Sequence, residues 1–182
     1  MNLLETILSA QGGGAVRQLG DQFGLDDRQT RSVIEQLTPA LARGLQKNAG
    51  NGDGLASLLG ALAAGNHQRY LEEPGALAGQ AALEGNGILG HIFGSKDVSR
   101  NVAGRAARET GVSSDVVKQM LPILASMAMA ALSRQAGQQG VVRGSAPPQA
   151  DDSAFGMLNS FLDSDKDGSS VDDIISIAQK FF

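Results

Sequence analysis

Residues 120–132, MLPILASMAMAAL, form the longest apolar run in the chain. This run is shorter than the roughly 20 residues that a helix needs to cross a bilayer. Met127 and Met129 suit a buried position, because flexible thioether side chains fill irregular gaps between packed helices. The run therefore predicts a helix at the centre of a protein core, and no transmembrane segment is expected.

Helical spacing of apolar residues extends from this run towards both ends of the chain, and no alternating pattern typical of a strand interrupts it. Asp26, Asp53 and Ser113 each precede such a stretch and can accept hydrogen bonds from the first amides of a helix. The sequence therefore predicts an all-α fold. The expected helices are residues 2–10, 14–23, 26–48, 53–71, 75–83, 87–93, 97–109, 113–135, 153–162 and 170–181.

The composition limits how the core is built and which functions are open. Hydrophobic residues make up 42% of the 182 residues but aromatic residues only 4%, so aliphatic and methionine side chains must fill the core. Cysteine is absent, which excludes disulfides, thiolate metal sites and cysteine catalysis. The net charge of −4 argues against a nonspecific nucleic-acid binder, which needs clustered Lys and Arg.

The first residues, MNLLETILSAQGGG, lack the basic region with which a signal peptide begins, and Glu5 comes early. They are typical of a short helix of the mature protein. A cytoplasmic location is expected on this basis, and export by a route without a classical signal is left open.

Residues 137–150, GQQGVVRGSAPPQA, interrupt the helical pattern. Gly, Gln and a Pro-Pro pair neither bury an apolar face nor continue a helix. We interpret residues 137–152 as a linker between a helical body, 1–136, and a C-terminal piece, 153–182. Because that piece is too small to fold alone, it is expected to dock on the body or on a neighbouring chain.

A weak internal repeat relates two parts of the body. One copy, FGLDDRQTRSVIEQLTPALARGLQKNAG, begins at Phe23, and the other, TGVSSDVVKQMLPILASMAMAALSRQAG, begins at Thr110. Pro39 and Pro122 occupy matching places in the two copies, and a proline inside a helix removes a hydrogen bond and bends the helix. The repeat favours a helical bundle of two pseudo-repeated layers. Chance similarity between helices rich in Ala and Leu is the alternative.

Several motifs occur together in an order that resembles a known family. They are FGLDD and LTPAL near the start, NGILGHIFGS at 86–95, TGVSSDVVKQMLPILASM at 110–127, and an acidic DxDxDG tail. In the order and spacing of these motifs the chain is similar to the YidB-like family, a bacterial family of unknown function. The resemblance implies an all-α bundle without an assigned catalytic activity, and it brings no catalytic residues to this sequence.

The stretch DSDKDGSSVDD, which begins at Asp163, carries the most specific chemical pattern in the chain. Asp163, Asp165 and Asp167 fill the first, third and fifth places of an EF-hand-like calcium loop. Gly168 permits the sharp turn at the sixth place, and Ser169 can offer its backbone carbonyl at the seventh. Apolar residues at helical spacing flank the loop on both sides. The C-terminal piece therefore predicts a single EF-hand-like helix–loop–helix that binds Ca²⁺.

The closing ligand departs from the EF-hand pattern. Ile174 stands at the twelfth place, where a bidentate Glu is usual. Asp172 and Asp173, at the tenth and eleventh places, are the candidates to close a shortened loop. The alternative is a plain acidic turn, since Ser170 and Asp173 form a capping-box arrangement and acids favour the start of a helix. That alternative does not account for the spacing of the first three aspartates.

Two other features suggest different functions. His91 lies in an apolar segment, where it is either the general base or ligand of an enzyme cleft or a partly buried capping residue. The stretch LGDQFGLDDRQTRSVIEQL can be interpreted as a DNA-binding helix-turn-helix with Arg28 and Arg31 early on its second helix. Asp26 and Asp27 argue against DNA binding, because they stand at the end of the helix that would approach the phosphates.

The remaining charged candidates are expected to form a solvated surface. His67 belongs to a polar stretch, and basic residues further along the chain are interspersed with Glu109 and Asp115. These basic residues are Arg100, Arg105, Arg108 and Lys118.

The sequence thus favours a non-enzymatic helical scaffold or interaction protein, with no catalytic and no cofactor-binding residues assigned. Ca²⁺ would neutralise the acids of the C-terminal loop and order residues 153–182. The apolar end, Phe181 and Phe182, would then dock in an apolar groove on the body or on a second copy. A homo-oligomer or another protein is the expected partner, and nucleic acid is not.

Overall fold

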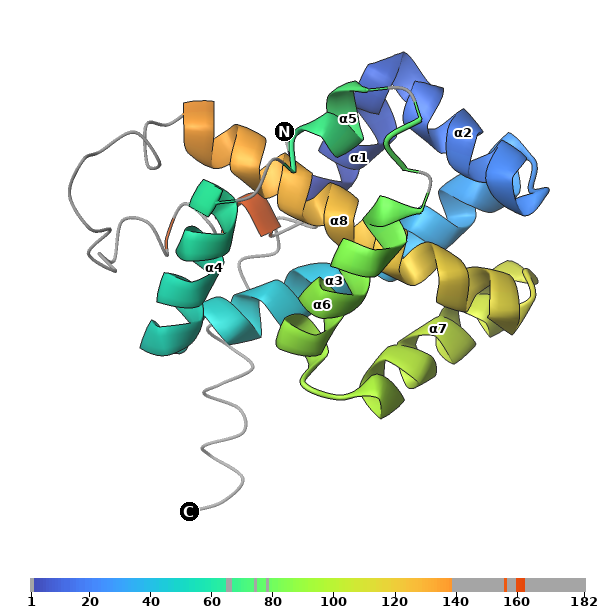
Figure 1. Ribbon diagram of the computed structural model, residues 1–182. Coiled ribbons are helices and arrows are strands. Elements are labelled where there is room, and N and C mark those ends of the chain that lie inside the picture. Colours follow the sequence, from blue (N-terminus) through green and yellow to red (C-terminus); the bar gives the residue numbers. More distant parts are fainter. Residues whose placement is uncertain are drawn as a thin grey trace.

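The computed structural model describes residues 2–64, 67–73, 75–77, 79–138, 156 and 160–162. Every regular element among these residues is a helix, which confirms the predicted all-α class (Figure 1). The elements are α1 (Leu3–Ser9), the short 3₁₀ helix η1 (Ala10–Gly13), α2 (Gly14–Phe23), α3 (Asp27–Ala49), α4 (Gly52–Ala64), α5 (Arg69–Glu72), α6 (Gln80–Phe93), α7 (Lys96–Thr110) and α8 (Ser114–Gln138).

Helix α8 is the axis of the fold. It contains the run MLPILASMAMAAL, and every residue from Met120 to Ser133 is buried. A helix that is apolar all round must be covered on all sides, and α8 contacts α1, α3, α4, α5, α6 and α7. The prediction of a central core helix is confirmed.

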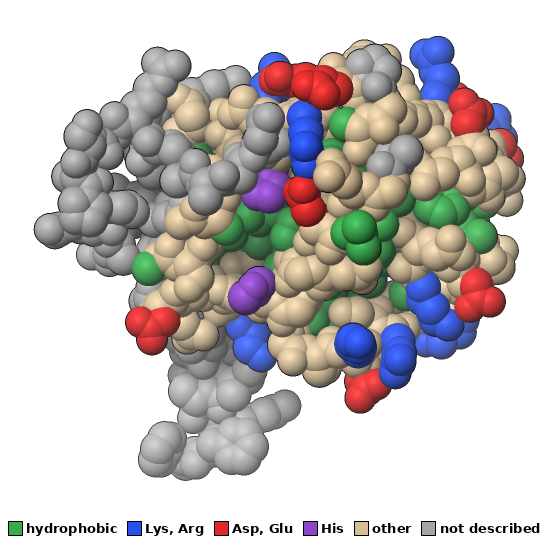
Figure 2. Space-filling view, viewed as in Figure 1, with side chains coloured by type: hydrophobic (Ala, Val, Ile, Leu, Met, Phe, Trp, Pro, Cys, Tyr) green, Lys and Arg blue, Asp and Glu red, His purple; other side chains and the backbone are tan. Residues whose placement is uncertain are grey.

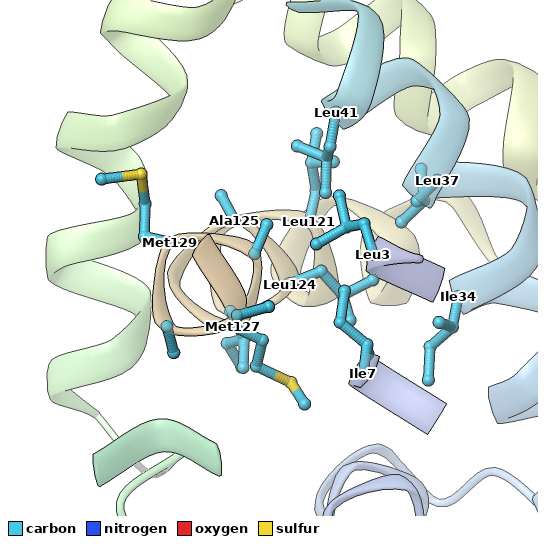
Figure 3. Packing of buried hydrophobic residues seen from close by; sticks show 14 of the residues in the cluster. Leu3, Ile7, Ile34, Leu37, Leu41, Leu121, Leu124, Ala125, Met127 and Met129 are labelled. Carbon is cyan, nitrogen blue, oxygen red and sulfur yellow. The ribbon is translucent and has the colours of Figure 1, made fainter. Parts of the chain in front are cut away.

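The view in Figure 3 shows how the side chains of α8 are shared among its neighbours. Leu121 and Leu124 lie towards Leu3 of α1 and Leu41 of α3, whereas Met129 points towards the opposite side of α8. Aliphatic and methionine side chains make up almost the whole core, and Tyr70 and Phe161 are the aromatic residues buried in it.

Helix α8 also passes the length and composition test for a membrane span among the described residues. Within Ser114–Gly137, an 18-residue window has a mean hydropathy of 1.5, and 83% of that window is buried inside the protein. Such burial is what the core helix of a protein shows, because a spanning helix would expose its apolar face to lipid. The helix is therefore explained by the packing of this domain.

Helix α6 approaches α8 closely through a glycine and a hydroxyl. A Cβ atom at Gly85 would collide with the backbone of Pro122, so only glycine permits this contact. The Ser126 hydroxyl donates a hydrogen bond to the carbonyl of Ala81 over 2.7 Å. These contacts explain why residues 80–93 form one helix, where the sequence predicted two with a break at the glycines.

The caps and helix boundaries follow the sequence with two further corrections. Asp26 caps α3 in a capping box with Gln29, and the Ser113 hydroxyl accepts a hydrogen bond from the amide of Val116, as predicted. Asp53 is not a cap, because α4 already begins at Gly52. The helix predicted at 53–71 is two helices, α4 (Gly52–Ala64) and α5 (Arg69–Glu72).

The division into a body, a linker and a C-terminal piece stays a prediction. Helix α8 continues to Gln138, so its last two residues belong to the predicted linker. The rest of the linker lies outside the described residues. Phe161 and Leu162 are helical and buried in the same core cluster as α8. The C-terminal piece therefore returns to the body at this point.

The two copies of the internal repeat form α3 and the α8 region. Pro39 and Pro122 each lie inside one continuous helix. The surroundings differ, since α3 buries one face and exposes Arg31, Arg43 and Lys47 on the other, whereas the centre of α8 is buried throughout. The two pseudo-repeated layers stay a prediction.

Candidate functional site

A groove opens between α4 and α6, with α8 beneath it. We call it the His91 groove; its cavity volume is about 270 Å³. The floor is apolar and the rim is polar, in the pattern of many binding sites. The residues that line it are Leu45, Asn48, Asp53, Gly54, Ser57, Leu58, Ala61, Ile88, His91, Ile92 and Met129. On the face shown in Figure 2, both histidines of the chain reach the surface and hydrophobic side chains lie between them.

The rim brings Asp53, Ser57 and His91 to one groove, which sequence reasoning had not brought together. Asn48 donates a hydrogen bond from Nδ2 to the backbone carbonyl of His91 over 2.7 Å, and this bond joins the ends of α3 and α6. Within the described residues, no hydrogen bond or ion pair joins the His91 side chain to Asp53 or Ser57. A nucleophile activated by a histidine needs such a contact. The rim therefore has the residue types of a catalytic triad without its geometry.

A second groove lies between α3 and α7, and we call it the α3–α7 groove. Its cavity volume is about 470 Å³, and the last turn of α6 forms one wall. Apolar side chains floor it, and its rim carries three cations and one acid. The lining residues are Gln36, Pro39, Ala40, Arg43, Gly44, Lys47, Ile92, Phe93, Val98, Val102, Arg105, Ala106 and Glu109.

Gly44 explains why this groove is walled by α6. A Cβ atom at Gly44 would collide with the Ile92 side chain and crowd Phe93. The glycine therefore lets the end of α6 lie against α3. Ile92 consequently lines both grooves.

The basic residues of α7 are partly neutralised by local acids. Arg100 pairs with Asp97 at 3.2 Å and Arg105 with Glu109 at 2.9 Å. On α8, Lys118 pairs in the same way with Asp115 at 3.3 Å. The predicted solvated face is confirmed for these residues. The sequence did not indicate that Arg105 would face Arg43 and Lys47 of α3 across a groove.

Among the described residues, Arg43 and Lys47 have no ion-pair partner. They stand four residues apart on α3, so they lie on one helix face. Both side chains belong to exposed residues at the rim of the α3–α7 groove. This pair of free cations distinguishes the α3–α7 groove from the His91 groove.

A polar cluster joins α5 to α6. Arg69 donates hydrogen bonds from Nη2 to the Tyr70 hydroxyl over 2.8 Å and to the Glu84 carboxylate over 2.7 Å. His67 Nδ1 lies 3.6 Å from the same carboxylate. The sequence had placed His67 at the surface, but only a small part of its side chain is exposed.

Burial raises the pKa of Tyr70 above its ordinary value, and the interaction of its hydroxyl with Glu84 raises it further, while Arg69 lowers it. The Arg69 guanidinium also stacks on the Tyr70 ring, 4.9 Å from its centroid. The cluster holds the short helix α5 to the body through charge-assisted hydrogen bonds. It is a structural network in which every charged group already has a neighbour.

The predicted calcium ligands are not among the residues that the structure describes. They are Asp163, Asp165, Asp167, Ser169, Asp172 and Asp173. Across the described ranges, no group of three or more His, Cys, Asp and Glu side chains is placed to hold a metal ion. The calcium site therefore stays a prediction that rests on the sequence.

The stretch interpreted as a possible helix-turn-helix forms α2 and α3, which contact each other as a helical hairpin. Arg28 and Arg31 are exposed at the start of α3. Asp26 caps this end of the helix and Asp27 lies in its first turn. Asp26 and Asp27 thus lie at the end of the helix that would approach the DNA phosphates, as the sequence indicated. Their charge argues against DNA binding.

The described residues define a helical domain with two surface grooves. A family profile described as "Bacterial protein of unknown function (DUF937)" matches residues 5–135. The chain belongs to this family, the YidB family, as its motifs predicted. The match ends before the acidic loop. No curated protein and no solved structure matches the chain significantly.

Proposed function

We propose that this chain is a non-enzymatic helical interaction protein that binds Ca²⁺ through its C-terminal loop. The observation that carries the proposal is the burial of Phe161 and Leu162 in the core cluster. The first loop residue, Asp163, follows Leu162 directly. A cation bound by the loop would therefore act on a segment that is already attached to the body.

Calcium fits the chemistry of the loop. Asp163, Asp165, Asp167 and the carbonyl of Ser169 are oxygen donors, which a hard cation prefers. One of Asp172 and Asp173 would close the loop. Without a cation the carboxylates repel one another, and this repulsion favours binding of a divalent ion.

Cation binding would neutralise these acids and order residues 153–182. The apolar end of the chain, Phe181 and Phe182, would then dock in an apolar groove of the body or of a second copy. Both grooves described above offer an apolar floor for such an end. The domain would thus link a change in calcium concentration to the placement of its own C-terminal segment.

The non-enzymatic assignment is supported by the His91 groove. The rim carries Asp53, Ser57 and His91 without a hydrogen bond between their side chains. The groove is also slightly smaller than the pockets of about 300 Å³ or more that hold small molecules. These features suit the side chains of a bound segment better than a reaction centre.

Size-exclusion chromatography with small-angle X-ray scattering, with calcium and with chelator, tests the proposal. We expect a smaller radius of gyration or a defined dimer in calcium. The Asp165→Ala variant is the matched control and should behave in calcium as the unmodified chain does in chelator. Identical compactness and oligomeric state of the unmodified chain in both conditions would refute the linkage between calcium and the tail.

A further inference from the structure

The two grooves differ in the charge of their rims. Across its described lining residues, the His91 groove carries the acid Asp53 and no Lys or Arg. The α3–α7 groove carries Arg43, Lys47 and Arg105, of which Arg105 alone pairs with an acid in the part of the chain that the structure describes. Both floors are apolar, so shape and hydrophobicity alone do not decide what each groove binds. The free cations select an acidic occupant for the α3–α7 groove.

The acidic part of this chain is its own C-terminal segment. Residues 151–182 contain seven Asp and two Lys, with no Glu and no Arg. Since the whole chain has a net charge of −4, this segment accounts for all of the negative excess. The end of this segment, residues 170–182, carries Asp172 and Asp173 against Lys180 alone, so its negative charge is complementary to the rim of the α3–α7 groove.

The end of the segment is also apolar in the way that a groove-binding helix requires. Val171, Ile174, Ile175, Ala178 and Phe181 recur at helical spacing, so that they would share one face. Such an amphipathic helix places an apolar face on a groove floor and leaves its polar residues at the rim. The segment thus matches both the floor and the rim of the α3–α7 groove.

The reach of the chain permits this contact. Leu162 is buried on the body, and Asp172 follows it ten positions later. While the loop holds no cation, an extended stretch of that length spans about 33 Å. A body of about 140 residues has a radius of gyration of about 14 Å. The segment can therefore reach the groove from a starting point well across the body.

We propose that residues 170–182 of the same chain bind in the α3–α7 groove. The apolar face of the segment covers the groove floor, and at least one of Asp172 and Asp173 faces Arg43 and Lys47. Only one of Asp172 and Asp173 is needed to close the calcium loop, so the other is available for this contact. The proposal deepens the proposed function, on which it rests for the choice of the C-terminal segment as ligand, and it names the groove that the segment occupies.

Disulfide trapping in the full-length chain tests the contact, because the chain has no native cysteine. One variant carries Val98→Cys at the groove, where the side chain is 42% exposed, together with Phe182→Cys. The control carries Leu83→Cys, 75% exposed on α6 and outside both grooves, with the same Phe182→Cys. The rate of intramolecular disulfide formation is measured by mass spectrometry with oxidised glutathione, at low protein concentration.

We expect the groove pair to close at least about ten-fold faster than the control pair, since a bound segment has a high effective concentration at its site. Adding Arg43→Glu and Lys47→Glu should reduce the rate to that of the control. Adding Asp172→Lys and Asp173→Lys to that variant should restore most of it, which a merely unfolded groove would not allow.

Equal rates for the groove and control pairs would overturn the proposal. A disulfide that joins the groove thiol of one chain to the tail thiol of another would also overturn it, because the occupant would then be a second copy. The rates are measured first in chelator and then in calcium. A calcium titration that shows no binding would refute the calcium site and leave the result of the disulfide experiment intact, so the two failures are distinguishable.

Discussion

The His91 groove and the α3–α7 groove are neighbours that share Ile92, yet their rims have opposite character. Both have apolar floors lined by helices that pack on a common core. The rim of one is set by Asp53 on α4, and that of the other by Arg43 and Lys47 on α3. The comparison teaches that packing supplies apolar grooves, whereas a few exposed charges decide what each groove can bind.

The largest expected effect comes from disturbing the packing of α6, the helix that walls both grooves. In Gly85→Ala, the new Cβ atom meets the backbone of Pro122, which cannot move aside as a side chain would. We expect a loss of about 3 kcal/mol in the free energy of unfolding, as overpacking of a tight core contact produces. Urea denaturation followed by circular dichroism measures it.

Gly87→Ala on the same helix is the matched control. No atom lies within 4 Å of the Cβ position at Gly87. This variant should be more stable than the unmodified chain by up to ~1 kcal/mol, because alanine is the better helix former. If both variants lose the same stability, the close approach of α6 to α8 is contradicted.

A smaller effect concerns the polar cluster that joins α5 to α6. Glu84→Gln removes the charge that Arg69 contacts at 2.7 Å, and we expect a loss of about 1 kcal/mol, since the carboxylate is partly exposed. The same variant should lower the pKa of Tyr70 relative to the unmodified protein, because Glu84 raises it. Tyr70 is the only tyrosine in a chain without tryptophan, so ultraviolet absorbance reports its titration directly.

The raised pKa of Tyr70 also fixes how stability depends on pH. The native state holds the tyrosine proton more tightly than the unfolded state, whose tyrosine has a pKa of about 10. The resulting stabilisation is fully present below about pH 10 and is lost as the pH rises through the higher native value. Thermal melts from about pH 9 upwards should show this loss in the unmodified chain and a weaker one in Tyr70→Phe.

A third effect reverses the rim charge of the His91 groove. Asp53→Arg gives the His91 groove a cation, and Ala61→Cys with Phe182→Cys reports the approach of the tail to that groove. We expect the rate of disulfide formation between these two introduced thiols to rise about three-fold, as a modest exposed charge effect would produce. No change at low ionic strength would contradict the claim that rim charge selects the groove.

The smallest effect is predicted for His91→Ala. His91 is exposed, and its contact with Asn48 uses the backbone carbonyl, which the substitution keeps. The free energy of unfolding should change by less than about 0.5 kcal/mol. A loss of several kcal/mol in a urea titration would show that the side chain has a structural role that the described contacts do not account for.

The sequence predicted the fold class and most helix ends, because these depend on local patterns. The run at 120–132 identified the core helix, and Asp26 and Ser113 marked helix starts. The unbroken α6 was missed, since Gly85 acts there through the backbone of Pro122, which is remote in sequence. A pattern of glycines alone does not separate a helix break from a close helix contact.

The grooves could not be predicted from the sequence, for a related reason. Arg43 and Lys47 look like the ordinary solvated face of an amphipathic helix, and only the packing of α7 places Arg105 opposite them. Tyr70, Arg69 and Glu84 are likewise joined across two helices. The predicted calcium loop is the reverse case, because its pattern is local and can be read from the sequence, while its residues lie outside the described ones.

Isothermal titration of the chelator-treated, full-length chain with CaCl₂ tests the proposed function most directly. The account predicts one saturable site per chain, which Asp165→Ala and Asp167→Ala each abolish. A chain that gives no saturable heat up to millimolar calcium would contradict it. The stretch DSDKDGSSVDD would then be a capped acidic turn.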